Sequence, residues 1–183
     1  MNETDLIKLA LDLGFADAAI INTKELVFIP NFRTLCEENL CGKYGVNFAC
    51  PPDCGTVEQM RDKVLQWQQA LVMQTMWDID DPLDNAQIKP AKAQHNHLTR
   101  KLIDTVGEPG LMIGASGCSL CNPCAITAGK PCRFPKLQYS CMSAYCIFVK
   151  DMAERCHMDY DCASGITAFF SMYCFVRHAV KGE

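Results

Sequence analysis

Apolar residues recur along this chain first with the period of a helix and then in short runs typical of buried strands. A helix is predicted over residues 4–13, because its apolar residues share one face, Thr4 can cap it and Gly14 can end it. The apolar run 18–21 predicts a short buried strand, and after a turn residues 26–28 can continue it. The N-terminal region therefore reads as a helix followed by a strand.

The same alternation continues to the end of the chain. Thr56 and Gln59 form a capping box for a helix that reaches to about residue 69. Beyond it the pattern predicts a strand at 70–77, a polar helix at 91–106, a strand at 111–113, a helix at 142–155 capped by Ser140, and a last strand at 166–176. No internal repeat or low-complexity linker interrupts this series.

This order of elements favours a single layered domain over residues 1–183, of the α/β or α+β class, with about four strands alternating with helices. Two cysteine-rich loops follow or flank predicted strand ends, where open sheets commonly build their sites. The fold is therefore expected to serve as a platform for these loops.

Composition and charge narrow the function classes. The chain is 49% apolar and 21% charged, as in ordinary soluble proteins, and its formal charge of −4 with no basic run gives no expectation of nucleic-acid binding. No apolar run approaches the length of a membrane span, and acidic residues stand where a signal peptide would carry Lys or Arg. We expect a cytoplasmic protein that does not bind membranes.

Thirteen cysteines are the main anomaly of the composition. In a reducing cytosol a disulfide framework is not expected, and the odd number leaves at least one thiol unpaired. Ligation of a metal or cluster explains so many thiols better. Their sensitivity to oxidation also points to an anaerobic source.

The central group of cysteines is Cys118, Cys121, Cys124 and Cys132. Three thiols at spacings of three in a loop of turn-forming residues are typical of a [4Fe-4S] site, because each thiolate must point inward from a tight bend. A zinc site is the alternative, since it also needs four thiolates, but it usually pairs two short Cys-x-x-Cys segments. A remote residue can also replace Cys132 as the fourth ligand.

The N-terminal group of cysteines is Cys36, Cys41, Cys50 and Cys54. Cys50 precedes a proline, as cluster ligands do in ferredoxins. Val57 stands where the three-cysteine run of radical S-adenosylmethionine enzymes would require a third cysteine, so that run is absent. Two alternatives remain: some of these thiols are buried small hydrophobes, or both loops contribute ligands to one composite site.

The remaining cysteines and the histidines give weaker signals. Most of the other thiols are expected to pack in the core; they are Cys141, Cys146, Cys156, Cys162 and Cys174. His95 and His97 face different directions on a predicted helix, and His157 and His178 stand alone, so none is expected to bind metal.

Three cations lie within the cysteine loops: Lys43, Lys130 and Arg133. They are expected to offset thiolate charge; holding an anionic substrate is the alternative.

Several motifs together resemble one prokaryotic protein family. These motifs are CGKYGVNFACPP from Cys41 to Pro52, the three cysteines from Cys118 to Cys124, and PCRFP from Pro131 to Pro135. Over nearly its whole length the chain resembles a family of cysteine-rich, predicted metal-binding proteins of unknown function that is common in anaerobes. Residues 139–147 resemble a family segment that usually has Glu and Gly where this chain has Ser143 and Cys146. The resemblance implies metal binding through the eight loop cysteines, and it supplies no reaction.

Three functional hypotheses follow. The first is an iron–sulfur protein with one or two [4Fe-4S] clusters that transfers electrons to or from a redox partner protein, since no dinucleotide or phosphate-binding motif is present. The second is an enzyme in which one cluster has an open iron that acts on a small substrate. The third is a zinc-stabilised interaction module. The sequence determines neither the substrate nor the oligomeric state.

Overall fold

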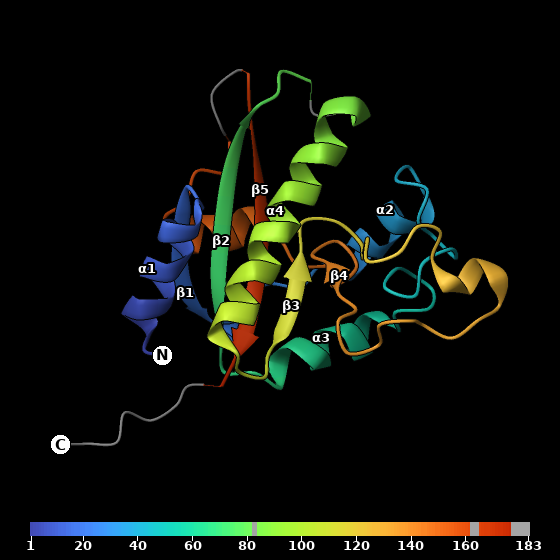
Figure 1. Ribbon diagram of the computed structural model, residues 1–183, viewed down its shortest axis with the longest axis horizontal. Coiled ribbons are helices and arrows are strands. Elements are labelled where there is room, and N and C mark those ends of the chain that lie inside the picture. Colours follow the sequence, from blue (N-terminus) through green and yellow to red (C-terminus); the bar gives the residue numbers. More distant parts are fainter. Residues whose placement is uncertain (82–83, 162–164, 177–183) are drawn as a thin grey trace.

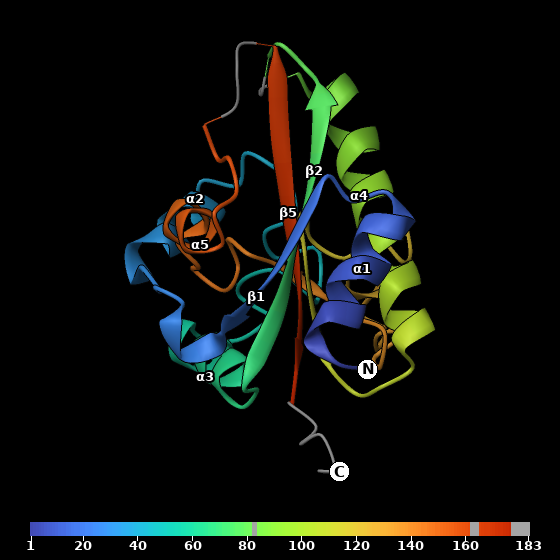
Figure 2. The same ribbon diagram turned by 90° about the vertical axis from the view of Figure 1, so that its left-hand side faces the viewer.

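A computed structural model describes residues 1–81, 84–161 and 165–176 of the chain. Its helices are α1 (Glu3–Leu13), α2 (Arg33–Glu37), α3 (Val57–Leu65), α4 (Asn85–Val106) and α5 (Val149–Arg155). Its strands are β1 (Asp17–Asn22), β2 (Gln69–Asp78), β3 (Leu111–Gly114), β4 (Ser140–Cys141) and β5 (Ile166–Phe175). The strands form one sheet with helices on both faces (Figures 1 and 2), so the predicted mixed, layered fold is confirmed.

The sheet is open and mostly antiparallel, with the strand order β1-β2-β5-β3-β4. Strands β2 and β5 pair over ten residues each and form its centre. Strand β3 is antiparallel to β5 and parallel to the two-residue strand β4. Consequently β3 and β4 form one side of the sheet, and this is the side that carries the loop from residue 115 to residue 139.

Each face of the sheet has its own apolar core. Helices α1 and α4 cover one face, where Leu6, Phe15 and Leu102 pack against Leu71 and Tyr173 of the central strands. Helices α3 and α5 lie on the other face (Figure 2), where the core is larger. Its members include Met60, Val64, Ile113, Met152 and Met172, all with no exposed surface.

Helix α4 begins at Asn85, six residues before the predicted start at residue 91. The side chain of Asp84 accepts a hydrogen bond from the amide of Ala86 (2.8 Å), which caps the helix, and Pro90 lies inside its N-terminal part. Helix α1 likewise begins at Glu3, one residue earlier than expected, because the side chain of Asn2 caps it in place of Thr4. Both helices therefore start earlier than predicted because a capping side chain, Asn2 or Asp84, precedes the first residue of the apolar pattern.

The helix predicted over residues 142–155 is wrong in its first half. Ser140 belongs to β4, residues 142–146 form turns, and α5 begins only at Val149. Cys146 adopts a positive φ of 56°, which a continuous right-handed helix does not allow.

Two further boundaries differ from the prediction. Residues 26–28 do not form a strand, since Phe28 makes only an isolated bridge to Ile147. Helix α3 ends at Leu65 rather than near residue 69, because Gln69 already belongs to β2. None of the described helices combines the length and apolar character that a membrane crossing requires.

Candidate metal centre

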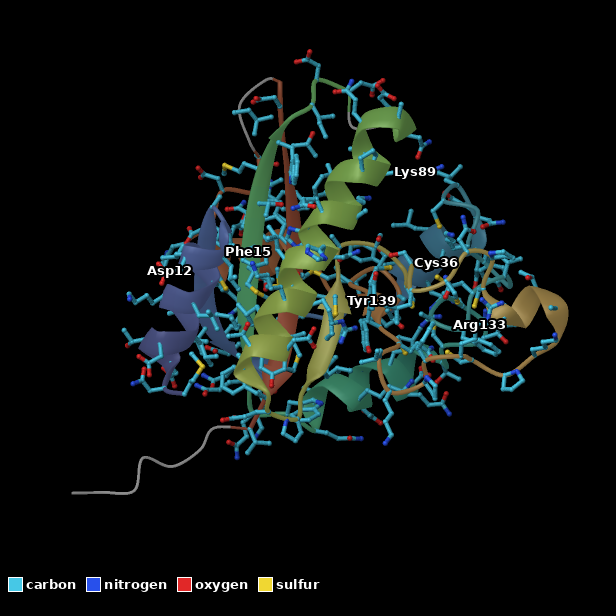
Figure 3. The ribbon with its side chains drawn as sticks, viewed as in Figure 1. Asp12, Phe15, Cys36, Lys89, Arg133 and Tyr139 are labelled. Carbon is cyan, nitrogen blue, oxygen red and sulfur yellow. The ribbon has the colours of Figure 1, made fainter. Side chains whose placement is uncertain are left out.

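Two cysteine-rich loops lie beyond β3 and β4, on the side of the molecule away from α1 (Figures 1 and 3). Figure 3 shows Cys36, Arg133 and Tyr139 on this side, whereas Asp12 lies on the opposite side on α1. One loop follows α2 and contains Cys41 and Cys50; the other follows β3. Residues far apart in the sequence therefore meet at one end of the fold.

Helix α4 holds the start of the second loop. The buried side chain of Asn96 donates a hydrogen bond from Nδ2 to Ser116 Oγ (2.8 Å) and accepts one at Oδ1 from the amide of Ala115 (2.9 Å). At the other end of the loop, the hydroxyl groups of Tyr139 and Ser119 lie 3.0 Å apart. These bonds attach the loop to the rigid sheet and helix.

Asn47 joins the two loops to each other. Its Nδ2 donates to the carbonyl oxygen of Cys118 (2.8 Å), and its Oδ1 accepts from the amide of Ala49 (3.0 Å). Asn47 is only 3% exposed, so its amide group has little access to competing water. The family-like motif around residue 47 thus contributes a structural link as well as cysteines.

The structure brings the central group together around one narrow pocket. Cys118, Cys121, Cys124 and Cys132 all line it, with apolar walls from Leu120, Phe48 and Phe134. The free space inside is only about 10 Å³, roughly that of one water molecule. Local spacing predicted that Cys118, Cys121 and Cys124 are neighbours, and the structure places Cys132, which spacing left open, at the same pocket.

The thiols of the central group differ in their environments. Burial raises the pKa of Cys118, and the nearby thiols of Cys121 and Cys132 raise it further. Burial alone would raise the pKa of Cys124. Hydrogen bonds from the backbone amides of Ile126 and Phe48 to its sulfur outweigh this and lower the pKa below its ordinary value. The loop is thus shaped to stabilise a thiolate at Cys124.

A second set of cysteines, here called the cavity group, comprises Cys36, Cys41, Cys50 and Cys141. All four line a larger cavity of about 670 Å³. Burial and, to a smaller extent, the thiol of Cys141 raise the pKa of Cys36 to about 11. The pKa of Cys50 is also raised, first by burial and then by the same Cys141 thiol. The charge of Cys141 thus acts on Cys36 and Cys50, and the three residues line the same cavity.

Cys54 does not belong to the cavity group, although its spacing in the sequence suggested it. It is 6% exposed and packs in the larger core, with its sulfur 3.6 Å from Nη1 of Arg33. The sulfur of Cys146 also interacts with the Arg33 guanidinium, while the pKa of Cys146 is raised above its ordinary value mainly by burial. The structure thus brings Cys141 to the cavity, and Cys54 to a separate contact with arginine.

The remaining cysteines and histidines lie away from these loops or outside the described residues. Cys156 and Cys174 are buried in the core as expected, while Cys162 and His178 lie outside the described residues. His97 and His157 are exposed. His95 is fully buried with Nδ1 2.7 Å from the hydroxyl of Thr75, and burial lowers its pKa to about 3.

The two groups adjoin at Gly117. A Cβ atom placed on Gly117 would lie 2.8 Å from the sulfur of Cys50, and the next residue is Cys118 of the central group. The absence of a side chain at position 117 therefore allows the two cysteine groups to approach closely. Among residues 1–81, 84–161 and 165–176, however, no three Cys, His, Asp or Glu side chains converge tightly enough to hold a single metal ion.

Sequence reasoning missed Cys141 and the two lysines of α4, Lys89 and Lys92, which line the cavity. Of the three loop cations considered from the sequence, Lys43 lines the cavity, whereas neither Lys130 nor Arg133 lines the pocket of the central group. A signal for Lys89 and Lys92 was present in their spacing of three, which places both on one side of a helix. The helix had been expected to begin only after the first of them.

Comparison with known proteins gives one result. A protein-family model described as "Predicted metal-binding protein (DUF2284)" matches residues 19–176. No curated protein and no solved structure matches the chain. The matched range includes both cysteine groups and the sheet that supports them.

Proposed function

Because the chain belongs to the DUF2284 family of predicted metal-binding proteins, we propose that it is an iron–sulfur protein with two [4Fe-4S] centres, and that it transfers electrons. The central group would hold one cluster. The cavity group would hold the other, with Cys141 in the place that sequence spacing had assigned to Cys54.

One observation carries this proposal: eight of the cysteines fall into two sets of four, each around its own space. Four thiolates are the complete protein ligand set of a cubane cluster. Neither set of thiols converges on one point in this structure: among the described residues no three potential ligands lie close enough together to hold a single ion. Either kind of centre would therefore require the cysteine side chains to turn toward the metal.

Residues of this chain would hold and shield such clusters. When bound, an iron–sulfur cluster supplies one-electron redox chemistry. Phe48 and Phe134 would limit the access of water to the central group. Asn47, through its bond to the carbonyl oxygen of Cys118, would keep the two centres at a constant separation. Neighbouring, rigidly held centres suit the passage of electrons through the protein.

A redox partner protein would dock where apolar side chains of the cysteine loops face solvent. Leu40 is 85% exposed beside Cys41, and Phe134 and Leu137 are 42% and 44% exposed near Cys132. Exposed apolar residues gathered around a site are typical of an interaction surface. Leu40→Asp should therefore slow reduction by a bacterial ferredoxin and leave reduction by dithionite unchanged. Equal effects on both reactions would contradict docking at this position.

A zinc centre in the central group is the second candidate. The observation that favours it is the narrow space of about 10 Å³, which suits one ion better than a cubane. A cubane would require the four side chains to turn outward, which short loop segments with exposed turns permit.

Metal analysis of the full chain, purified without air, distinguishes these candidates. About eight irons and eight sulfides per chain, with the visible absorption of a cubane and its loss on reduction, would support two clusters. One zinc with about four irons would assign zinc to one of the groups. Zinc with no labile sulfide would refute the iron–sulfur proposal.

A further inference from the structure

Apart from the thiols of the cavity group, the described charged side chains that line this cavity are all cations. Lys43 of the first cysteine loop and Lys89 and Lys92 of α4 all line it. Among the described residues no Asp or Glu lines it, although the whole chain has 21 acidic and 17 basic residues. Cations gathered in this way in a protein of net negative charge attract anions, both the thiolates of the site and a further ligand.

These lysines have no carboxylate partner within the described part of the chain. The ion pairs found there involve Lys8, Arg61, Lys150, Arg155 and the N-terminus. The ammonium group of Lys92 instead lies 5.4 Å from the ring centre of Phe169. Figure 3 shows Lys89 near the N-terminal end of α4, on the same side of the molecule as Cys36. None of the three ammonium groups is therefore neutralised by a carboxylate of the described residues, and the charge of Lys92 acts on the thiol of Cys141.

The cavity has more room than a cluster requires. In the measure by which one water molecule occupies about 10–15 Å³, the eight atoms of a cubane would fill about 80–120 Å³ of the 670 Å³. The remainder is within the size range of small-molecule sites, which is about 300–1,000 Å³. Lys92 also lines an adjoining cavity of about 270 Å³, so space continues past its side chain.

The other walls of the cavity are largely apolar. Leu35, Leu40 and Ile88 line it together with the ring of Tyr44 and with Pro51. Ligand sites commonly combine such walls with a few polar groups that fix the orientation of the ligand. The cations therefore suit one end of a ligand and the apolar walls suit its body.

We propose that this cavity binds a small organic carboxylate with an apolar body, whose carboxylate contacts Lys89 and Lys92 and whose body lies against the cavity group. The inference rests on the proposed function in that the ligand lies beside the centre held by Cys36, Cys41, Cys50 and Cys141. It adds a ligand class to a site for which the family description names only metal.

Calorimetric titration of the metal-loaded full chain with 2-naphthoate tests this proposal. The matched ligand is 2-naphthamide, which has the same size and shape but no charge. We expect the acid to bind about a hundredfold more tightly than the amide, about tenfold for each of the two lysines, because hydrogen bonds between charged groups contribute more than those to a neutral group. Bound naphthoate should also change the electron paramagnetic resonance spectrum of the reduced protein.

Substitutions locate the site. Lys89→Met and Lys92→Met should each weaken naphthoate binding about tenfold and leave naphthamide binding unchanged, while Lys92→Arg should retain most of the affinity. Lys136→Met is the matched control, since Lys136 is exposed and does not line the cavity. The control should leave both affinities unchanged.

Equal affinities for the acid and the amide, or no binding of either, would overturn the inference. If the lysine variants lose iron and the acid and the amide bind with equal affinity, the lysines only offset thiolate charge. This result would overturn the inference too. Iron and sulfide are measured on the same samples. A protein without them refutes the proposed function, whereas the difference between acid and amide is read independently of the metal.

Discussion

Replacing one cysteine at a time tests which four cysteines bind the second cluster: the four that sequence spacing suggests or the four that line one cavity in the structure. Spacing places Cys54 with Cys36, Cys41 and Cys50, whereas in the structure Cys141 lines the cavity with those three. The informative pair of variants is therefore Cys141→Ala and Cys54→Ala. Both remove one sulfur from a side chain of the same size, so each serves as the control for the other.

The expected change follows from the ligand count. With two four-iron clusters, the unmodified protein holds about eight irons per chain. Cys141→Ala removes the protein ligand from one corner of one cluster, so iron should fall to about seven or fewer. Cys54→Ala should keep about eight. It should instead lower the free energy of unfolding by about 1–2 kcal/mol, because a buried sulfur is lost from the core and from its contact with Arg33.

The assay is iron and labile sulfide per chain on anaerobically purified protein, together with electron paramagnetic resonance of the oxidised sample. A three-iron signal should appear in Cys141→Ala and be absent from Cys54→Ala. Urea unfolding of the same samples measures the change in stability. Full iron in Cys141→Ala combined with lost iron in Cys54→Ala would refute the reasoning from the structure and restore the grouping based on spacing.

Three other substitutions test features around the site. Gly117→Ala should lower iron to about four per chain, because the added Cβ would lie 2.8 Å from the sulfur of Cys50, where ordinary contacts are about 3.5–4.0 Å; retention of eight irons would contradict the close approach of the two groups. Asn96→Ala removes two hydrogen bonds to the loop after β3 and should lower the free energy of unfolding in urea by about 2–3 kcal/mol, so an unchanged midpoint would argue against this attachment. Burial lowers the pKa of His95 from 6.5 to about 3, so below pH 6.5 the unfolded chain takes up a proton that the folded chain excludes. The contribution of neutral His95 to the free energy of unfolding is complete above pH 6.5, and it should fall by about 2 kcal/mol between pH 7 and pH 5. His95→Gln should lack this part of the pH dependence of stability. Identical pH profiles of the two proteins would contradict the prediction.

Local sequence patterns were sufficient to predict the elements that depend on residues close together in the sequence. The apolar run that becomes β2 and the periodic face of α1 were predicted because each feature lies within one element. The central group could be predicted as neighbours for the same reason, since Cys118, Cys121 and Cys124 are close in sequence. Its ligand role remains a proposal.

Long-range contacts could not be predicted in this way. Cys141 reaches Cys50 only because β4 pairs with β3, and a two-residue strand carries almost no sequence signal. The region after it was predicted as a helix, because nothing in its apolar pattern reveals the positive φ of Cys146. Lys89 was missed because the start of α4 depends on a cap at Asp84 rather than on its apolar face.

The position of β5 has a consequence for how the protein is made. Among the described strands it comes last in the sequence, yet it lies in the middle of the sheet, between β2 and β3. During synthesis β3 therefore has no antiparallel neighbour until residues 166–175 have left the ribosome, and the loop that β3 carries has no firm platform. Metal loading should then follow the synthesis of β5. Ribosome-bound chains stalled before β5 should fail to retain iron that released chains keep, and equal retention would show that the loops assemble without the finished sheet.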